Sequence, residues 1–169
     1  MSLSIQSVRD LLSKHGLSAV IIPTGDPHSS EYPCPHWELR KALCPFTGSA
    51  GRVVITSDKA LLWTDSRYWE QAQIELEGTL FTLMRDGDPA TPRLTPWLCE
   101  NLPCGSRVGI DACSYALKPF SKLQAALKAC GMTLGDVSDA LYALWDERPE
   151  LYPVPALPFE SGQRPRPEK

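Results

Sequence analysis

The chain has 169 residues, 43% of them hydrophobic, and its 17 basic and 20 acidic residues give a formal net charge of −3. This length and composition suit one domain with a sizeable core that folds alone. Because the sequence has no basic block, we expect neither a nucleic-acid partner nor an anionic membrane surface as a partner.

The first predicted element is a helix that ends at Gly16. Ile5, Val8 and Leu11 recur at helical spacing, and glycine is the usual residue just after a helix. The continuous apolar run SAVIIP at 18–23 is then typical of a strand covered on both faces. A long polar loop follows this strand.

Residues 51–65, GRVVITSDKALLWTD, predict a β-hairpin. Two apolar runs flank the turn residues Ser57, Asp58 and Lys59. A helical pattern follows at 67–76, and LFTLMRD returns the chain to an extended form. The hairpin therefore leads into a helix and then another strand.

The second half alternates in the same way. RVGIDA and MTLGDV predict two further strands, and a helix lies between them. Proline is tolerated in a first helical turn, so Pro119 places the start of this helix near Lys118, and Gly131 ends it. A last helix is predicted within 138–149.

Alternating strands and helices with one hairpin predict an α/β fold. We expect a three-layer domain with a mixed, mostly parallel sheet flanked by helices over residues 1–150. Residues 151–169 are proline-rich and are predicted to form a linker or tail. The turn after the first strand has a single glycine, Gly25, which argues against a phosphate-cradling dinucleotide fold.

Six cysteines are scattered without a C-x-x-C pair, which argues against a zinc site and a redox motif. We expect them to be reduced thiols, because a domain of this size needs no disulfides for stability. No apolar run approaches the roughly 18 residues of a membrane span, and the start lacks the build of a signal peptide. The predicted location is the cytoplasm.

The polar loop at 24–51 carries the groups that could bind a ligand. Asp26, His28 and Glu31 lack the ligand spacing of a metal site on a helix, so no metal site is predicted here. The alternative is a loop held by Asx-type hydrogen bonds and a Glu–Arg pair. Long ordered loops of this kind are often functional.

Nucleophilic catalysis has weak support. Cys34 has His28 and His36 near it in sequence, and Ser49 lies in a G-S-A-G turn, but neither arrangement indicates a spatial pairing. His15 ends the first helix, where a partly charged imidazole suits the helix dipole. From the residues alone, the chain has binding groups and no evident catalytic centre.

Arg67 follows Thr64, Asp65 and Ser66 at the start of a predicted helix. A cation in a first turn opposes the partly positive helix N-terminus and costs about 0.3–1 kcal/mol. Such a placement raises the question of what the guanidinium binds.

Five segments, in this order and at these intervals, resemble the amino-terminal domain of aminopeptidase P, the Xaa-Pro aminopeptidase of the creatinase/prolidase family, in its cytosolic eukaryotic type. They cover nearly the whole chain: IIPTGDPHSSEY at 21–32, ALCPFTGSAGRVVIT at 42–56, LLWTDSRYWEQA at 61–72, SRVGID at 106–111 and LWDERPELYPVPAL at 144–157.

The resemblance implies a non-catalytic domain that helps bind and gate peptide substrate. Family members remove the N-terminal residue from peptides with proline second, using two metal ions, usually Mn²⁺, in a carboxyl-terminal catalytic domain. We therefore expect no cofactor in this chain, two Mn²⁺ in the missing domain, and as partners a peptide, that domain and a second copy of the full-length protein. The alternative is a stand-alone α/β module that binds a peptide or an anion.

The resemblance also implies site residues. Arg67 matches the arginine of the family's T-D-G-R-Y motif, which contributes to substrate binding, and a planar guanidinium suits a carboxylate or a peptide carbonyl. Ser66 replaces the motif's glycine, and serine is a good helix cap. The alternative for Arg67 is a salt bridge to Asp65 or Glu31.

The remaining candidates come from the first loop. We expect His28, Glu31, Tyr32 and Arg40, together with Asp26, to form a wall of the same cleft. One or two of the nearby aromatic residues are expected to pack in the core in preference to stacking on substrate, because aromatics commonly anchor cores. These aromatic residues are Trp63, Tyr68 and Trp69.

Overall fold

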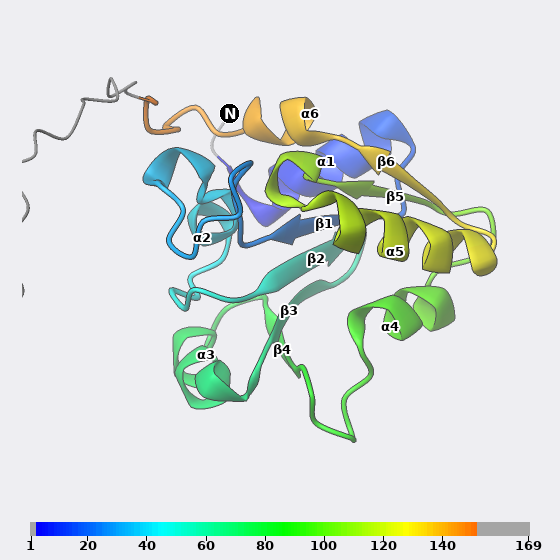
Figure 1. The fold of residues 1–169 in the computed structure, drawn as a ribbon, viewed down its shortest axis with the longest axis horizontal. Coiled ribbons are helices and arrows are strands. Elements are labelled where there is room, and N and C mark those ends of the chain that lie inside the picture. Colours follow the sequence, from blue (N-terminus) through cyan, green and yellow to red (C-terminus); the bar gives the residue numbers. More distant parts are fainter. Residues whose placement is uncertain (1–2, 152–169) are drawn as a thin grey trace, which may run out of the picture.

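A six-stranded sheet with the order β4-β3-β2-β1-β5-β6 organises the computed structural model, which describes residues 3–151 (Figure 1). β1 pairs antiparallel with β2, as does β2 with β3, whereas the other three pairs are parallel. The mixed, mostly parallel sheet is therefore confirmed. The strands are β1 Ala19–Pro23, β2 Arg52–Thr56, β3 Ala60–Thr64, β4 Thr82–Arg85, β5 Arg107–Ile110 and β6 Thr133–Asp136.

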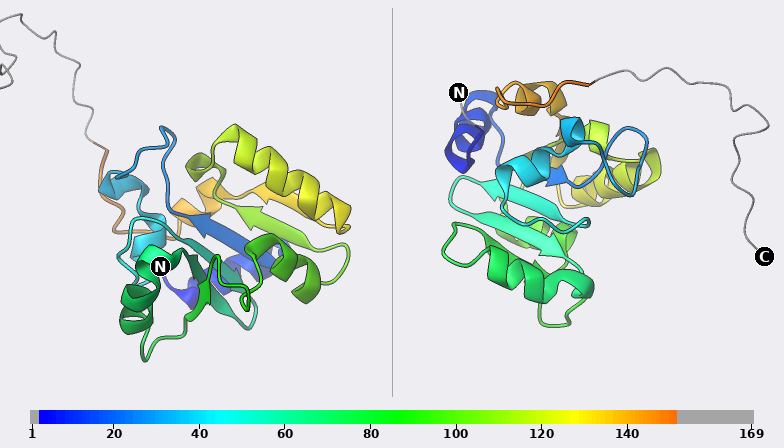
Figure 2. Two further views of the ribbon diagram at one scale, coloured as in Figure 1. Left: turned by 60° about the horizontal axis from the view of Figure 1, so that its bottom comes forward. Right: turned by 90° about the vertical axis from the view of Figure 1, so that its left-hand side faces the viewer.

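Helices cover both faces of this sheet and make the predicted three layers. One apolar core lies between the sheet and α1, α2, α3 and α6, and a second lies between the sheet and α4 and α5. Figure 2 shows α1 and α5 on opposite sides of the strands. The helices are α1 Ile5–His15, α2 Leu39–Leu43, α3 Trp69–Glu75, α4 Leu94–Asn101, α5 Leu117–Ala129 and α6 Ser138–Tyr142.

Strand β1 contributes to both cores because its side chains alternate across the sheet. Ala19 and Ile21 point to the α4/α5 side, whereas Val20 and Ile22 point to the α1 side. All five residues of β1 are buried. The prediction of a strand covered on both faces is thus confirmed.

Helix α1 has the boundaries that its sequence predicts. Ser4 and Ser7 form a reciprocal capping box, in which each side chain accepts a hydrogen bond from the other's backbone N–H, at 3.1 Å and 2.9 Å. Gly16 ends the helix with a φ of 60°, a left-handed conformation that glycine adopts without strain.

The β2–β3 hairpin is also confirmed, with Val53 opposite Leu62 and Val54 opposite Leu61. Thr56 closes its turn, because its Oγ1 accepts from the backbone N–H of Lys59 at 2.9 Å. These are local interactions, which explains why the turn residues signalled the hairpin.

Several helical segments of the described structure have no counterpart in the sequence prediction, among them the following. The polar loop contains the turn Pro35–Trp37 and α2, and α4 lies between β4 and β5. Helix α4 is eight residues long, has Pro96 in its first turn and begins without a side-chain cap. Its buried Leu94, Trp97 and Leu98 pack on the sheet, so tertiary contacts stabilise a helix with weak local signals.

The expectation of six reduced thiols is wrong for two of them. A disulfide joins Cys99, near the end of α4, to Cys130, which follows α5. The sequence separation of 31 gave no signal, but the packing of α4 beside α5 brings the two Cα atoms to 5.8 Å, within disulfide range. The other four cysteines are free thiols: Cys34, Cys44, Cys104 and Cys113.

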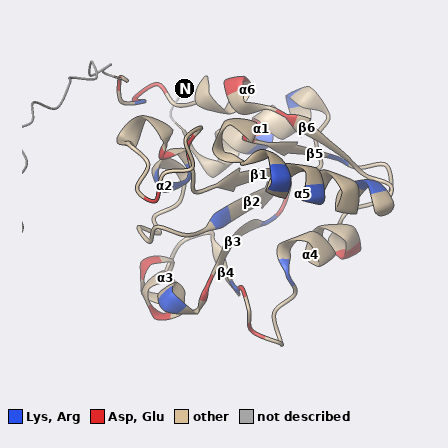
Figure 3. Cartoon of the chain, viewed as in Figure 1, with Lys and Arg blue, Asp and Glu red and all other residues tan. Residues whose placement is uncertain are grey.

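Apart from Leu151, the predicted linker at 151–169 lies outside the described residues. Within residues 3–151, no helix has the length and hydrophobicity needed to cross a membrane. In the view of Figure 3, acidic and basic segments are interspersed over the ribbon, in keeping with the balanced charge.

Candidate functional site

Arg67 lies in a 3-10 turn, Ser66–Tyr68, that leads from β3 into α3. Asp65 caps this turn, because its Oδ1 accepts from the Arg67 backbone N–H at 3.1 Å. The cap is therefore Asp65, whereas the sequence suggested Ser66. The carboxylate of Asp65 also lies where the helix N-terminus favours an anion.

The side chains of Arg67 and Asp65 form a two-point ion pair. Arg67 donates from Nε to Oδ1 at 2.9 Å and from Nη2 to Oδ2 at 2.8 Å. The predicted alternative, a salt bridge to Asp65, is confirmed. It answers the question raised by a cation in a first turn, because the neighbouring carboxylate offsets the unfavourable dipole.

This pair leaves part of the guanidinium available. The Arg67 side chain is 67% exposed. Arginine carries five N–H donors, and the pair with Asp65 uses two of them. Arg67 can therefore keep its partner and still donate to an external carboxylate or carbonyl.

The pair predicts a measurable titration. The hydrogen bond from Arg67 lowers the pKa of Asp65 from the ordinary aspartate value, and partial burial of the carboxyl does not reverse this shift. Because the folded-state pKa is depressed, the stabilisation is present above the unfolded-state pKa of about 3.9 and is lost as the pH falls through the folded value. NMR titration should show the Asp65 pKa below that value, and Arg67→Ala should raise it. An Asp65 pKa that does not move in Arg67→Ala would contradict the pairing.

The loop before α2 is ordered by Asp26. Its Oδ1 accepts from the backbone N–H groups of His28 at 3.0 Å and Ser30 at 2.9 Å, and the residue is 5% exposed. This is the predicted Asx-type arrangement. The predicted Glu–Arg pair does not form in this loop. Glu38 instead pairs with Lys41. Asp26 therefore shapes the loop and does not form part of an exposed wall.

Three of the predicted loop residues do lie at the surface. His28 and Glu31 are exposed, and Tyr32 is 77% exposed. The side-chain hydrogen bond that Arg67 donates to Asp65 is the main cause of the raised pKa of Arg67, and the charge of Glu31 adds to it. The charge of Glu31 therefore acts on Arg67 as a minor contribution beside Asp65.

Arg40 is buried, whereas His28, Glu31 and Tyr32 lie at the surface. Arg40 is 1% exposed and extends along the domain interior. It donates from Nε to Thr24 Oγ1 at 2.7 Å, from Nη1 to the Phe46 carbonyl at 2.5 Å and from Nη2 to the Gly48 carbonyl at 2.6 Å. Arg40 therefore holds three segments of the chain together and does not line an open cleft.

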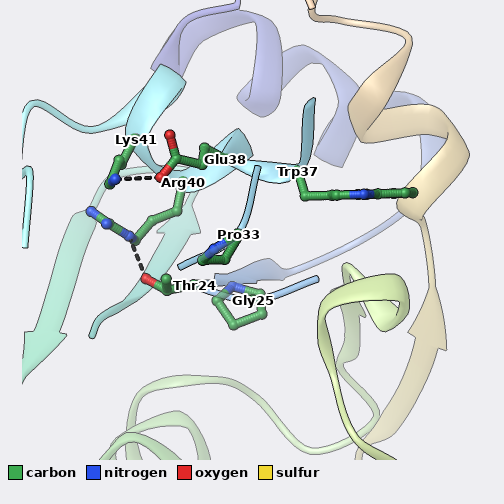
Figure 4. Close-up of a pocket in the computed structure, with 8 residues that line it drawn as sticks. Thr24, Gly25, Pro33, Trp37, Glu38, Arg40 and Lys41 are labelled. Carbon is green, nitrogen blue, oxygen red and sulfur yellow. Dashed lines mark hydrogen bonds and ion pairs between the residues drawn. The ribbon is translucent and has the colours of Figure 1, made fainter. Parts of the chain in front are cut away.

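Figure 4 shows the surroundings of Arg40. Its guanidinium points to Thr24, and Lys41 and Glu38 form their ion pair beside it. The space enclosed with Pro33 and Trp37 is about 10 Å³, which is room for one water molecule at most. No ligand-sized cavity adjoins Arg40 here.

Arg40 is linked to Arg67 through packed side chains. The Arg40 guanidinium lies 5.0 Å from the Phe46 ring, which packs edge-on against Tyr68 at 5.8 Å. Ser49 adds a hydrogen bond of 2.7 Å between its Oγ and the Tyr68 hydroxyl. The buried arginine thus supports the residue next to Arg67.

The 46–49 turn fits under Tyr68 only because Gly48 lacks a side chain. A Cβ on Gly48 would lie 2.2 Å from Phe46 Cζ and 2.9 Å from Tyr68 Cδ1. The sequence did not indicate that this turn supports the candidate site. Its Gly-Ser-Ala-Gly composition gave only the signal of a tight turn.

The aromatic residues behave as expected. Trp63 is fully buried, and its Nε1 donates to the Pro92 carbonyl at 3.0 Å. Tyr68 packs against the α1-side core, and Trp69 donates to the Thr64 carbonyl at 3.0 Å. Their contacts are structural.

Neither candidate nucleophile, Ser49 or Cys34, forms a hydrogen bond to a histidine among the described residues. Ser49 pairs with Tyr68, not with a histidine. Cys34 is an exposed thiol, and the Nδ1 of His36 lies 2.6 Å from the Pro149 carbonyl. Within residues 3–151, no three His, Cys, Asp or Glu side chains gather closely enough to hold a metal ion. The described residues therefore do not fit a two-metal centre.

Comparison with protein families and known proteins gives a consistent result. The family described as the Creatinase/Prolidase N-terminal domain matches residues 5–144. Xaa-Pro aminopeptidase ApepP of Drosophila melanogaster is 42% identical over 133 residues, which are 78% of this chain and 22% of that protein. Xaa-Pro aminopeptidase 2 of Homo sapiens is 37% identical over 164 residues, which are 96% of this chain and 23% of that protein. The chain spans less than a quarter of either relative.

Solved structures agree. X-prolyl aminopeptidase from Caenorhabditis elegans, described as a cytosolic enzyme with a di-nuclear active site, matches with a TM-score of 0.75 and 34% identity, over 80% of this chain and 22% of that one. The N-terminal domain of the cytoplasmic peptidase PepQ from Mycobacterium tuberculosis matches with a TM-score of 0.62 and 21% identity, over 83% of this chain and 96% of that one. At that identity the second match concerns the fold alone.

Proposed function

Because this chain belongs to the creatinase/prolidase N-terminal domain family, we propose that it is the non-catalytic N-terminal domain of an Xaa-Pro aminopeptidase. In this role it helps bind and gate peptides that have proline second. The relatives it resembles are Xaa-Pro aminopeptidases about four times its length, which supports the assignment.

The single observation that carries the proposal is the geometry of Arg67. The guanidinium is exposed, is held in one orientation by Asp65, and keeps unused donors. A planar donor array held in this way is suited to a peptide carboxylate or carbonyl, and little conformational entropy remains to be lost on binding. Arg67 is therefore our main substrate-binding residue.

The first loop contributes the rest of the proposed surface. His28, Glu31 and Tyr32 are exposed on a loop that Asp26 holds in shape, and the charge of Glu31 contributes to the raised pKa of Arg67. A carboxylate near the arginine suits the charged amino end of a peptide. We assign Arg40 a positioning role, because its donors bind the turn under Tyr68.

The chemistry is assigned to another domain. Residues 3–151 offer no grouped metal ligands, so the two Mn²⁺ ions would be held by a carboxyl-terminal catalytic domain and would activate water there. That domain, a second copy of the longer protein and a cytoplasmic location remain parts of this proposal. A Caenorhabditis elegans relative is described as cytosolic.

Arg67→Ala tests the proposal in a protein that carries this domain together with its catalytic domain. Loss of a charge-assisted contact to substrate should raise KM about tenfold, corresponding to roughly 1.4 kcal/mol. The melting temperature should change little, because the side chain is exposed. Arg85→Ala is a suitable control, because Arg85 lies opposite Thr64 in the sheet and donates to Gln73 at 2.8 Å. If both KM and kcat are unchanged in Arg67→Ala, Arg67 is not part of the site.

A further inference from the structure

Two bonded cysteines join the carboxyl ends of α4 and α5, and a third cysteine lies against Gly131, the residue after one of them. The Cys99–Cys130 disulfide connects these ends, and the exposed thiol of Cys104 lies in the loop between α4 and β5. No feature of the proposed peptide-binding surface involves them. They form a separate cluster with its own chemistry.

The Cys104 sulfur lies against the backbone next to Cys130. Its Sγ is 4.0 Å from the carbonyl oxygen of Gly131, and a Cβ on Gly131 would come within 2.6 Å of that sulfur. Gly131 also has a φ of 74°, a left-handed conformation suited to glycine. Residue 131 therefore leaves the space that the Cys104 side chain occupies.

Backbone hydrogen bonds keep the two segments side by side. The N–H of Gly105 donates to the Gly131 carbonyl at 2.9 Å, and the N–H of Thr133 donates to the Ser106 carbonyl at 3.0 Å. The pairing continues into the parallel strands β5 and β6, with Arg107 opposite Thr133. The sheet itself thus holds Cys104 beside Gly131, the residue that follows Cys130.

We propose that Cys104 is an exchange thiol for the Cys99–Cys130 disulfide. The Cys104 thiol first loses its proton to solvent, and the thiolate attacks the sulfur of Cys130. The Cys104–Cys130 bond forms as the Cys99–Cys130 bond breaks, and Cys99 leaves as a thiolate that takes a proton from solvent. One disulfide and one thiol are present before and after, so no oxidant or reductant is needed.

The exchange changes what the disulfide connects. The Cys99–Cys130 bond ties α4 to the end of α5, whereas a Cys104–Cys130 bond ties α5 to the loop after α4 and leaves α4 itself without a direct covalent link to α5. At the opposite ends of these helices lies a groove of about 640 Å³, lined by residues of both, including Arg93, Thr95 and Lys122. Exchange therefore removes the direct covalent link within the α4–α5 pair that borders this groove.

The test follows the free thiol over time. The oxidised chain is held at about pH 8.5, where cysteine forms a substantial thiolate fraction, quenched with acid and alkylated. Cleavage after Glu100 separates Cys99 from Cys104, so peptide mass spectrometry identifies each disulfide. Alkylation at Cys99 and the Cys104–Cys130 peptide should grow together, about tenfold above the level in Cys104→Ser. The rate should not depend on protein concentration.

Two outcomes would overturn the proposal. Cys99 could become alkylated no faster in the natural chain than in Cys104→Ser, or the new disulfide could join Cys104 to Cys99. Cys99→Ser provides an independent check, because mild oxidation should then link Cys104 to Cys130. A Cys130 that stays fully alkylatable in folded Cys99→Ser would also contradict it. The experiment on the natural chain does not require that variant to fold.

Discussion

Replacing Arg40 with alanine is expected to lower the free energy of unfolding by about 3 kcal/mol, one of the largest effects available in this domain. Three acceptors depend on this guanidinium: Thr24 Oγ1 and the carbonyls of Phe46 and Gly48. All three lose a charge-assisted donor, and two of these bonds are buried. A buried acceptor left without a donor retains its full desolvation cost.

Lysine should restore little of this stability. Its ammonium is a single centre, whereas Arg40 reaches three acceptors in different directions from Nε, Nη1 and Nη2. We therefore expect Arg40→Lys to fall closer to Arg40→Ala than to the natural chain. Burial already lowers the pKa of Arg40, and its neighbourhood is arranged for a planar group.

Thermal unfolding gives the comparison, with Arg67→Ala as the matched control. A loss of about 3 kcal/mol corresponds to a melting temperature about 6–12 °C lower for a domain of this size. The exposed Arg67 should change the melting temperature little. Equal shifts for Arg40→Ala and Arg67→Ala would contradict the structural role of Arg40.

Elements with local signals were predicted from the sequence. The terminal glycine of α1, the turn residues of the β2–β3 hairpin and the proline in the first turn of α5 are all short-range features. Each acts through neighbours a few residues away, so the sequence order itself contains the information. The start of α5 at Leu117 lies one residue from the predicted Lys118.

Features that depend on distant contacts were not predicted. Helix α4 has no capping side chain and is stabilised by packing of Trp97 on the sheet. Cys99 and Cys130 meet only because α4 and α5 pack together. Sequence spacing gives no information about either contact, because both are consequences of the tertiary fold.

In the candidate site too, the short-range contacts were predicted from the sequence and the long-range contacts of Arg40 were not. The Asp65–Arg67 pair spans two residues and was foreseen as an alternative, and the Asx turn at Asp26 was foreseen too. Arg40 was placed with the exposed loop because it shares a polar segment with His28. The burial of Arg40 depends on its hydrogen bonds to carbonyls of the 46–49 turn, which folds back over it. No local sequence pattern indicates such a contact.

The prediction with the largest effect concerns catalysis. We expect this chain alone to hydrolyse no Xaa-Pro peptide. Its described residues offer neither grouped metal ligands nor a serine or cysteine side chain hydrogen-bonded to a histidine, and the role we propose for Arg67 is binding. Binding groups without a positioned nucleophile or metal stabilise a bound peptide but do not lower the barrier to its cleavage.

The most direct test of this division of labour is a hydrolysis assay on an Xaa-Pro peptide with Mn²⁺ present. We predict no turnover above background for the 169-residue chain, and turnover for a protein in which this domain is joined to its catalytic domain. Manganese-dependent cleavage by the purified 169-residue chain, at a rate that scales with its concentration, would contradict the proposal that catalysis belongs to another domain.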